Sequence, residues 1–214
     1  LPTLVSLRFK EANIVVFSTG NIYPMASLAS GGCTEESPPE PVGEYSMSSL
    51  ARERIFEHAS RVYGSSVLLY RLNYAVDLRY GVLHDLAQTI LQNEPISLKT
   101  PAFNCIWQGY ANEVALRSLL LAESPAGRMN VTGPETVSVA YAASKLGEQL
   151  DRQPVFIDEP SDRAYLSNAG RCLQLFGYPE VSLNTLIRWQ AEWILSGGKS
   201  LGKPTHFEER GGKY

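Results

Sequence analysis

The sequence has few of the residues that hold metals or form disulfides. Its three cysteines lie far apart and form no C-x-x-C pair: Cys33, Cys105 and Cys172. Its three histidines are equally dispersed: His58, His84 and His206. Zinc sites need closely spaced ligands, and disulfide scaffolds need paired cysteines. We therefore predict no metal site and expect the cysteines to be reduced thiols.

Long apolar runs and clusters of one charge are missing as well. The chain has 19 Lys and Arg residues against 22 Asp and Glu residues, and the two signs are interspersed. A nucleic-acid-binding surface needs clustered basic charge, and a membrane span needs about 18 to 20 consecutive apolar residues. We therefore expect a cytoplasmic protein with no nucleic-acid partner and no membrane partner.

The most informative feature present is an apolar strand that runs into small polar residues. Residues 14–17 read IVVF and are followed by Ser18, Thr19 and Gly20. This pattern is typical of a buried parallel strand whose carboxyl end opens into a site. About two dozen residues later, Tyr45 begins a segment with helical spacing of its apolar residues, so that a serine at position 49 lies on the same helix face.

This arrangement resembles the extended short-chain dehydrogenase/reductase family, the NAD-dependent sugar epimerases and dehydratases. In that family a strand-end Ser or Thr precedes a Tyr-x-x-x-Lys helix. The resemblance covers the C-terminal two thirds of the family pattern. It continues through residues 68–73 (LLYRLN) and 130–133 (NVTG), which resemble later strands, and from Ser167 to Trp193, which resembles the closing helices.

The resemblance implies an α/β fold with a Rossmann-like parallel sheet and a smaller C-terminal α/β substrate lobe. Residues 1–76 would be the second half of a Rossmann-like dinucleotide-binding domain. Residues 77–214 would mainly form the substrate-binding lobe, with some segments returning to the sheet. The family also dimerises through its tyrosine helix, which implies a homodimer formed through the helix from Tyr45 to Tyr63.

The same resemblance assigns roles to individual residues. Thr19 and Tyr45 would be catalytic, because the family's tyrosine is a general acid/base and its strand-end hydroxyl bonds the substrate oxygen. The residues implied to contact the cofactor, NAD or NADP, are Ser18, Tyr45, Ser49 and Leu72. The residues implied to contact substrate are Gly20, Asn21 and Asn73.

Two positions differ from the family pattern. Ser49 replaces the lysine that lowers the tyrosine pKa and holds the nicotinamide ribose, and Arg52, one turn further, is an alternative source of positive charge. An unassisted tyrosine has a pKa of about 10, so roughly one in a thousand is ionised at pH 7. Gly20 and Asn21 replace the Asp-Glu pair of the dehydratases, and a neutral pair cannot do that acid/base work.

These differences leave two hypotheses for the function. The first is an NAD(P)-dependent epimerase or oxidoreductase that acts on a sugar or nucleotide-sugar-like substrate. The second is a non-catalytic relative that binds cofactor or ligand, with Ser49 marking lost chemistry, or a truncated fragment unable to bind cofactor.

A glycine-rich phosphate loop is not found in the sequence. No G-x-x-G-x-x-G occurs, and none of the three glycine pairs follows an apolar strand and opens a helix. A dinucleotide pyrophosphate is held by such a strand, turn and helix. The first residues, 1–11, have the spacing of the middle of an amphipathic helix. Both observations predict that the N-terminal half of the dinucleotide domain, needed for cofactor binding, lies outside this sequence.

The spacing of apolar residues also predicts the order of elements. A Pro-, Ser- and Gly-rich loop is expected from Tyr23 to Glu44, and the tail from Gly197 to Tyr214 is expected either to fold over a neighbouring subunit or to be partly disordered. Trp107 and Tyr110 are interpreted as a buried aromatic cluster. The predicted helices and strands are helices at 1–11, 45–63, 81–92, 109–121 and 138–150, strands at 13–18, 66–72 and 103–107, and a last helix containing Leu183 to Ile194.

Overall fold

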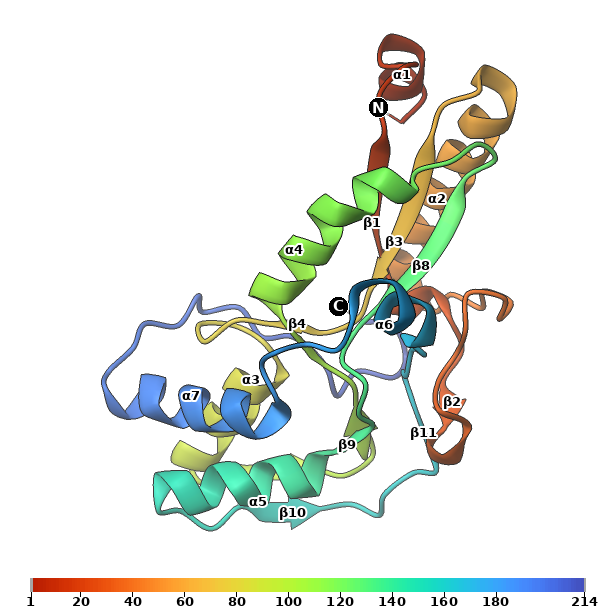
Figure 1. Cartoon of the computed structure of the whole chain (residues 1–214). Helices are drawn as coiled ribbons and strands as arrows, with labels where there is room; N and C mark the ends of the chain where they lie inside the picture. Colours follow the sequence, from red (N-terminus) through yellow and green to blue (C-terminus); the bar gives the residue numbers. More distant parts are fainter. Residues whose placement is uncertain (1, 214) are drawn as a thin grey trace.

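The computed structural model describes residues 2–213, so the first residue of the predicted N-terminal helix and the last residue of the predicted tail lie outside the described chain. The fold is α/β, as predicted, and is built on a parallel sheet of strand order β1-β3-β8 (Figure 1). The three strands are β1 (Ile14–Thr19), β3 (Val67–Leu72) and β8 (Gly127–Val131). The apolar sequence of the central strand β3 suits a strand that is covered on both faces of the sheet.

The register of this sheet brings the strand ends together. Thr19 lies opposite Leu72, and Leu72 lies opposite Val131. Because parallel strands end at the same edge of a sheet, the polar residues that follow each strand meet there. This edge is where the predicted site residues of β1 and β3 are expected.

Alternate residues of β3 face different helices. Val67 and Leu69 pack with Phe56 of α2 (Gly43–Tyr63) and with α1 (Pro2–Arg8). Leu68 and Tyr70 point to the opposite face, which is covered by α4 (Gln108–Arg117) and α6 (Gly170–Phe176). The period-two alternation of a strand therefore builds two small cores from one apolar sequence.

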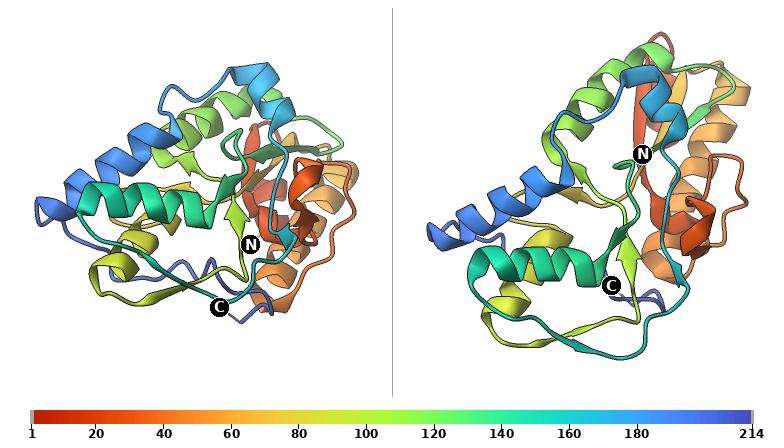
Figure 2. Two further views of the ribbon diagram at one scale, coloured as in Figure 1. Left: turned by 90° about the horizontal axis from the view of Figure 1, so that it is seen from below. Right: turned by 60° about the horizontal axis from the view of Figure 1, so that its bottom comes forward.

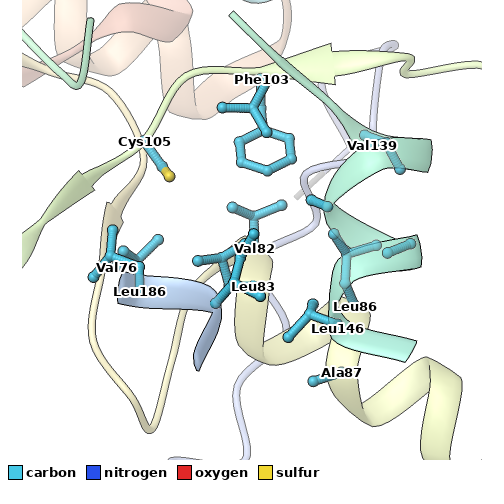
Figure 3. Close-up of a cluster of buried hydrophobic side chains, with 14 of the residues drawn as sticks. Val76, Val82, Leu83, Leu86, Ala87, Phe103, Cys105, Val139, Leu146 and Leu186 are labelled. Atoms are coloured by element: carbon cyan, nitrogen blue, oxygen red, sulfur yellow. The ribbon is translucent and has the colours of Figure 1, made fainter. Parts of the chain in front are cut away.

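A larger core lies beside the sheet and is drawn in Figure 3. Phe103 is fully buried there among side chains of α3 (Val82–Leu91), α5 (Val139–Leu150) and α7 (Leu183–Leu195). Each of these helices has its buried residues on one face, as the three- and four-residue spacing of Leu83, Leu86 and Ile90 illustrates. The division of the chain into two domains at residue 76 stays a prediction.

Short strand pairs and 3-10 turns connect these layers. The pairs are β2 (Ala26–Ser27) with β11 (Arg163–Ala164), β4 (Ala75–Val76) with β7 (Ile106–Trp107), β5 (Pro95–Ser97) with β10 (Val155–Ile157), and β6 (Ala102–Phe103) with β9 (Val137–Ser138). The 3-10 turns are η1 (Gly20–Ile22), η2 (Leu28–Ser30) and η3 (Ser118–Leu121). No helix within residues 2–213 is long and apolar enough to cross a membrane.

Several predicted boundaries were wrong. The strand expected at 103–107 is two strands, β6 and β7, because the chain changes pairing partner at Asn104. The helix expected to reach residue 121 ends at Arg117 and tightens into η3. The segment expected to be a long loop, from Tyr23 to Glu44, contains β2 and η2, and α2 begins at Gly43 rather than Tyr45.

A buried ion pair fixes α2 against the sheet. Arg71 of β3 donates from Nε and Nη2 to the Glu53 carboxylate at 3.0 and 2.7 Å, and from Nη1 to the Tyr23 hydroxyl at 2.6 Å. The Tyr23 hydroxyl in turn donates to Asn130. This network connects the segment after β1, the helix α2 and strands β3 and β8.

The C-terminal tail packs against its own chain. Phe207 is buried in the large core, and Thr205 donates to the Asp85 carboxylate from both its backbone nitrogen and its hydroxyl. Near the end, Gly212 lies against Gly43 at the start of α2 (Figure 2). Residues 197–213 therefore differ from both arrangements expected for the tail, which were folding over a neighbouring subunit and partial disorder. This packing was not predicted because a single phenylalanine is a weak signal in the sequence.

Candidate active site

A cavity of about 390 Å³ opens at the carboxyl edge of the parallel sheet. Six of the eight predicted site residues line it. The lining residues are Ser18, Thr19, Asn21, Tyr45, Leu72, Asn73, Tyr74, Ala75, Tyr80, Gly81, Val82, Pro204, Thr205 and His206. The cavity therefore joins the ends of β1 and β3 with the start of α2, the start of α3 and the C-terminal tail.

Thr19 has a structural contact as well as a place in the cavity. Its hydroxyl oxygen accepts a hydrogen bond from the Asn21 backbone nitrogen at 3.1 Å, which caps η1. A hydroxyl that accepts one bond keeps its own hydrogen for donation. Thr19 is thus held in one orientation by the backbone, with a donor at the end of β1.

Ser18 carries one of four buried side-chain oxygens that have no hydrogen-bond partner among residues 2–213, and it lines the cavity. The residue is 8% exposed. Leaving a buried hydroxyl unpaired costs about 1–3 kcal/mol. A ligand group in the cavity would satisfy it, and this favours a binding role for Ser18.

Tyr45 and Ser49 lie one turn apart on α2 but have different surroundings. Tyr45 is half-exposed and lines the cavity, whereas Ser49 is buried and does not. Arg52 is exposed and is also outside the lining. The implied contact of Ser49 with cofactor stays a prediction.

Gly20 does not line the cavity, but its surroundings leave little room for a side chain. A Cβ atom at Gly20 would lie 2.6 Å from the Ser167 hydroxyl oxygen and 3.0 Å from the Asn73 side chain. Asn73 is itself fixed, because its amide donates to the Asn104 side chain at 2.8 Å. Gly20 therefore allows the turn after β1 to pack against Asn73. Its implied contact with substrate stays a prediction.

Two tyrosines in the lining were missed from the sequence. Tyr74 follows Asn73 with a φ of 41°, and Tyr80 precedes α3. Burial, followed by the charge of Asp85 and then that of Tyr45, raises the pKa of Tyr80, so this phenol keeps its proton and can donate to a ligand. The turn Tyr80-Gly81 before an apolar helix was the available signal.

No group of three or more His, Cys, Asp or Glu side chains within residues 2–213 is arranged to hold a metal ion. The three cysteines are free thiols and are buried. Burial, with a smaller contribution from Glu135, raises the pKa of Cys105 to about 12. This thiol is therefore protonated and unreactive at neutral pH.

Comparison with solved structures identifies the fold. The dTDP-glucose 4,6-dehydratase of Bacillus anthracis, solved with NAD, superposes with a TM-score of 0.76 at 15% identity, covering 91% of this chain and 65% of that one. The UDP-glucose 4-epimerase of Thermus thermophilus, also solved with NAD, gives 0.73 at 21% identity, covering 89% and 66%. The chain has the fold of the extended short-chain dehydrogenases/reductases. The family resemblance in the sequence is thereby confirmed at the level of the fold.

A third similar structure was solved with a nucleotide sugar that carries a carboxylate. The UDP-glucuronic acid 4-epimerase of Bacillus cereus, solved with a fluorinated UDP-glucuronic acid and NAD, gives a TM-score of 0.71 at 16% identity, covering 85% of this chain and 61% of that one. The chain thus spans about two thirds of the length of these enzymes or slightly less. No protein-family model and no curated protein matches it.

Proposed function

We propose that this chain forms the catalytic and substrate-binding part of an NAD(P)-dependent epimerase or oxidoreductase acting on a sugar or nucleotide-sugar-like substrate. The observation that carries the proposal is the convergence of Thr19, Tyr45 and Asn73, from three separate segments, on one cavity. Ligand sites of α/β sheets lie at this edge, beyond the carboxyl ends of the strands. The enzymes of known structure with this fold support the substrate class and the use of NAD.

The chain's own residues would divide the work at a substrate hydroxyl. The Thr19 hydroxyl, oriented by its bond with Asn21, would donate to the substrate oxygen. The Tyr45 phenol would exchange the proton of that oxygen as a general acid/base. Tyr80 and Asn73 would hold neighbouring hydroxyls of the substrate. A bound NAD or NADP supplies the hydride acceptor for this chemistry.

The described residues fit one end of the dinucleotide. The unpaired Ser18 hydroxyl, the phenol of Tyr45 and the apolar Leu72 line a space suited to a nicotinamide and its ribose. The pyrophosphate is different: within residues 2–213, the strands β1, β3 and β8 lead into η1, β4 and β9, and none opens an α-helix. A helix N-terminus after a strand is the usual pyrophosphate site, so these three strands do not provide that contact.

The experiment is a comparison of two Tyr→Phe variants on the same helix. Tyr45→Phe removes the proposed acid/base, and Tyr63→Phe removes a partly exposed phenol at the far end of α2. With NAD and UDP-glucose supplied, we expect Tyr45→Phe to lower kcat by about 100-fold or more and Tyr63→Phe to leave it unchanged. Equal activity of the two variants would remove Tyr45 from the mechanism.

A non-catalytic binding protein is the second candidate function. The observation in its favour is Ser49, which stands in the family's lysine position and brings no positive charge to Tyr45. Such a protein would bind dinucleotide and nucleotide sugar without turnover. Calorimetric binding of both ligands, together with an absence of product in the assay above, would support this second function over the first.

A further inference from the structure

The C-terminal strap, defined as residues 197–213, runs from the end of α7 back to the start of α2 (Figure 2). It is anchored at several points along its length. Leu201 donates from its backbone nitrogen to the Arg79 carbonyl at 3.0 Å, and the Thr205 hydroxyl donates to Asp85 at 2.5 Å. Further on, Arg210 donates to the Ser161 hydroxyl at 3.2 Å. These contacts hold the strap on its own chain.

The middle of the strap forms part of the cavity wall. Pro204, Thr205 and His206 line the same cavity as Thr19 and Tyr45. His206 is exposed and has a φ of 54°, a left-handed conformation that is unfavourable for residues other than glycine. Its neighbours Thr205 and Phe207 are both anchored, so they impose this conformation. Local strain of this kind is concentrated at ligand sites.

The other lining side chains determine what the cavity is suited to bind. They are hydroxyls, amides, phenols and apolar groups, all uncharged in their ordinary states. Such groups pair well with sugar hydroxyls, which both donate and accept, and aromatic rings cover the apolar faces of sugars. His206 is the lining side chain with two ring nitrogens, each of which donates or accepts a hydrogen bond according to the tautomer.

The fold alone does not select between a neutral and an acidic sugar. Similar structures include an enzyme named for UDP-glucose and one named for UDP-glucuronic acid, which differ by a carboxylate on the sugar. A carboxylate placed in a cavity without a fixed positive charge loses hydration that is not replaced. A neutral imidazole accepts or donates a hydrogen bond but does not neutralise that carboxylate.

We propose that the strap completes the sugar subsite, and that His206 is its specificity-determining residue, contacting an uncharged hydroxylated ring. This inference rests on the proposed function, because it assumes that the cavity takes the sugar of a nucleotide sugar. His206 then acts on affinity and selection, whereas Thr19 and Tyr45 act on the reacting hydroxyl.

The test is calorimetric titration of the full chain at pH 8 with UDP-glucose and with UDP-glucuronic acid. We expect UDP-glucose to bind about 10-fold tighter, the size of effect of an unpaired polar group. His206→Gly removes the imidazole without backbone strain, because glycine adopts a positive φ freely. It is expected to weaken UDP-glucose binding about 10-fold. His58→Ala, which removes an exposed histidine outside the cavity lining, is the control and should change nothing.

A gain-of-charge variant tests the selection directly. His206→Arg places a permanent positive charge in the wall and should reverse or abolish the preference for UDP-glucose by strengthening UDP-glucuronic acid binding about 10-fold. Equal binding of the two nucleotide sugars to the unmodified chain, or an effect of His206→Gly no larger than that of His58→Ala, would overturn this inference alone. Binding of neither nucleotide sugar would overturn the proposed function and this inference with it.

Discussion

Ser18 and Thr19 are adjacent hydroxyl residues with opposite energetic roles. Thr19 satisfies a backbone donor at the start of η1, so it contributes to the stability of the ligand-free chain. The buried Ser18 hydroxyl has no hydrogen-bond partner in the described part of the chain, so it lowers that stability and is available to a ligand. Side chains at binding sites commonly lower the stability of the ligand-free fold.

This contrast predicts the behaviour of two small substitutions. In ligand-free protein, Ser18→Ala should leave the free energy of unfolding unchanged or raise it by about 1 kcal/mol, because an unsatisfied oxygen is removed. Thr19→Val should lower it by about 1 kcal/mol, because the cap is lost. Urea unfolding of both variants measures this. A loss in Ser18→Ala as large as that in Thr19→Val would mean that the Ser18 hydroxyl is stabilising.

The sequence predicts those cavity residues whose positions follow from spacing along the chain. The strand end at Ser18-Thr19 and the helix face of Tyr45 follow from spacing along the chain, and these residues do line one cavity. Tyr80 and His206 were missed because their place in the lining depends on the packing of α3 and of the strap. The burial of Ser49 also depends on what packs against α2, which its position on the helix does not reveal.

Among the helices, α2 carries Tyr45 of the cavity at its start and two carboxylates on its buried side. Its buried side carries Glu53, which pairs with Arg71, and Glu57, which accepts from Arg54 and Arg128. Burial raises the pKa of Glu57, but the hydrogen bonds and charges of the two arginines outweigh burial and lower it overall. Its carboxylate therefore stabilises the fold above the ordinary pKa of glutamate, and that contribution is lost as the pH falls through the lowered value.

The outer side of α2 carries an apolar stripe, which supports the proposed homodimer. Met47, Ile55 and Val62 are 58%, 41% and 57% exposed and lie within about 80° of one another around the helix. Ile55→Glu should convert a dimer to a monomer, as measured by light scattering on a sizing column. Leu120→Glu, at an 86% exposed position in η3, is the control. A wild-type monomer at micromolar concentration would contradict the dimer.

Elements with a regular apolar period were predicted from the sequence to within a few residues, whereas irregular ones were not. The strands at 14–19 and 67–72 and the helix α5 agree with their apolar spacing. The break between β6 and β7 could not be predicted, because it depends on the buried side chain of Asn104, which bonds Asn73 and the Ser167 backbone.

For the whole molecule, the arrangement of the chain explains how distant segments share one cavity. The carboxyl edge of the sheet gives Thr19 and Asn73, α2 gives Tyr45, and the strap closes back from the last helix to give His206. Strands β1 and β3 could be predicted from the sequence because each begins with a run of apolar residues. The strap could not, because its attachment depends on Phe207 and a few polar contacts, such as Thr205 with Asp85.

Under the proposed function, this cavity is a catalytic site in which Ser49 stands where the family's lysine would support Tyr45. The most direct measurement is the steady-state rate of the wild-type protein and of Ser49→Lys with NAD and UDP-glucose. We expect slow turnover by the wild type and a rate at least about 10-fold higher for Ser49→Lys, because a lysine charge stabilises the phenolate. Turnover by neither protein, with both ligands bound by each, would contradict it and leave a binding protein.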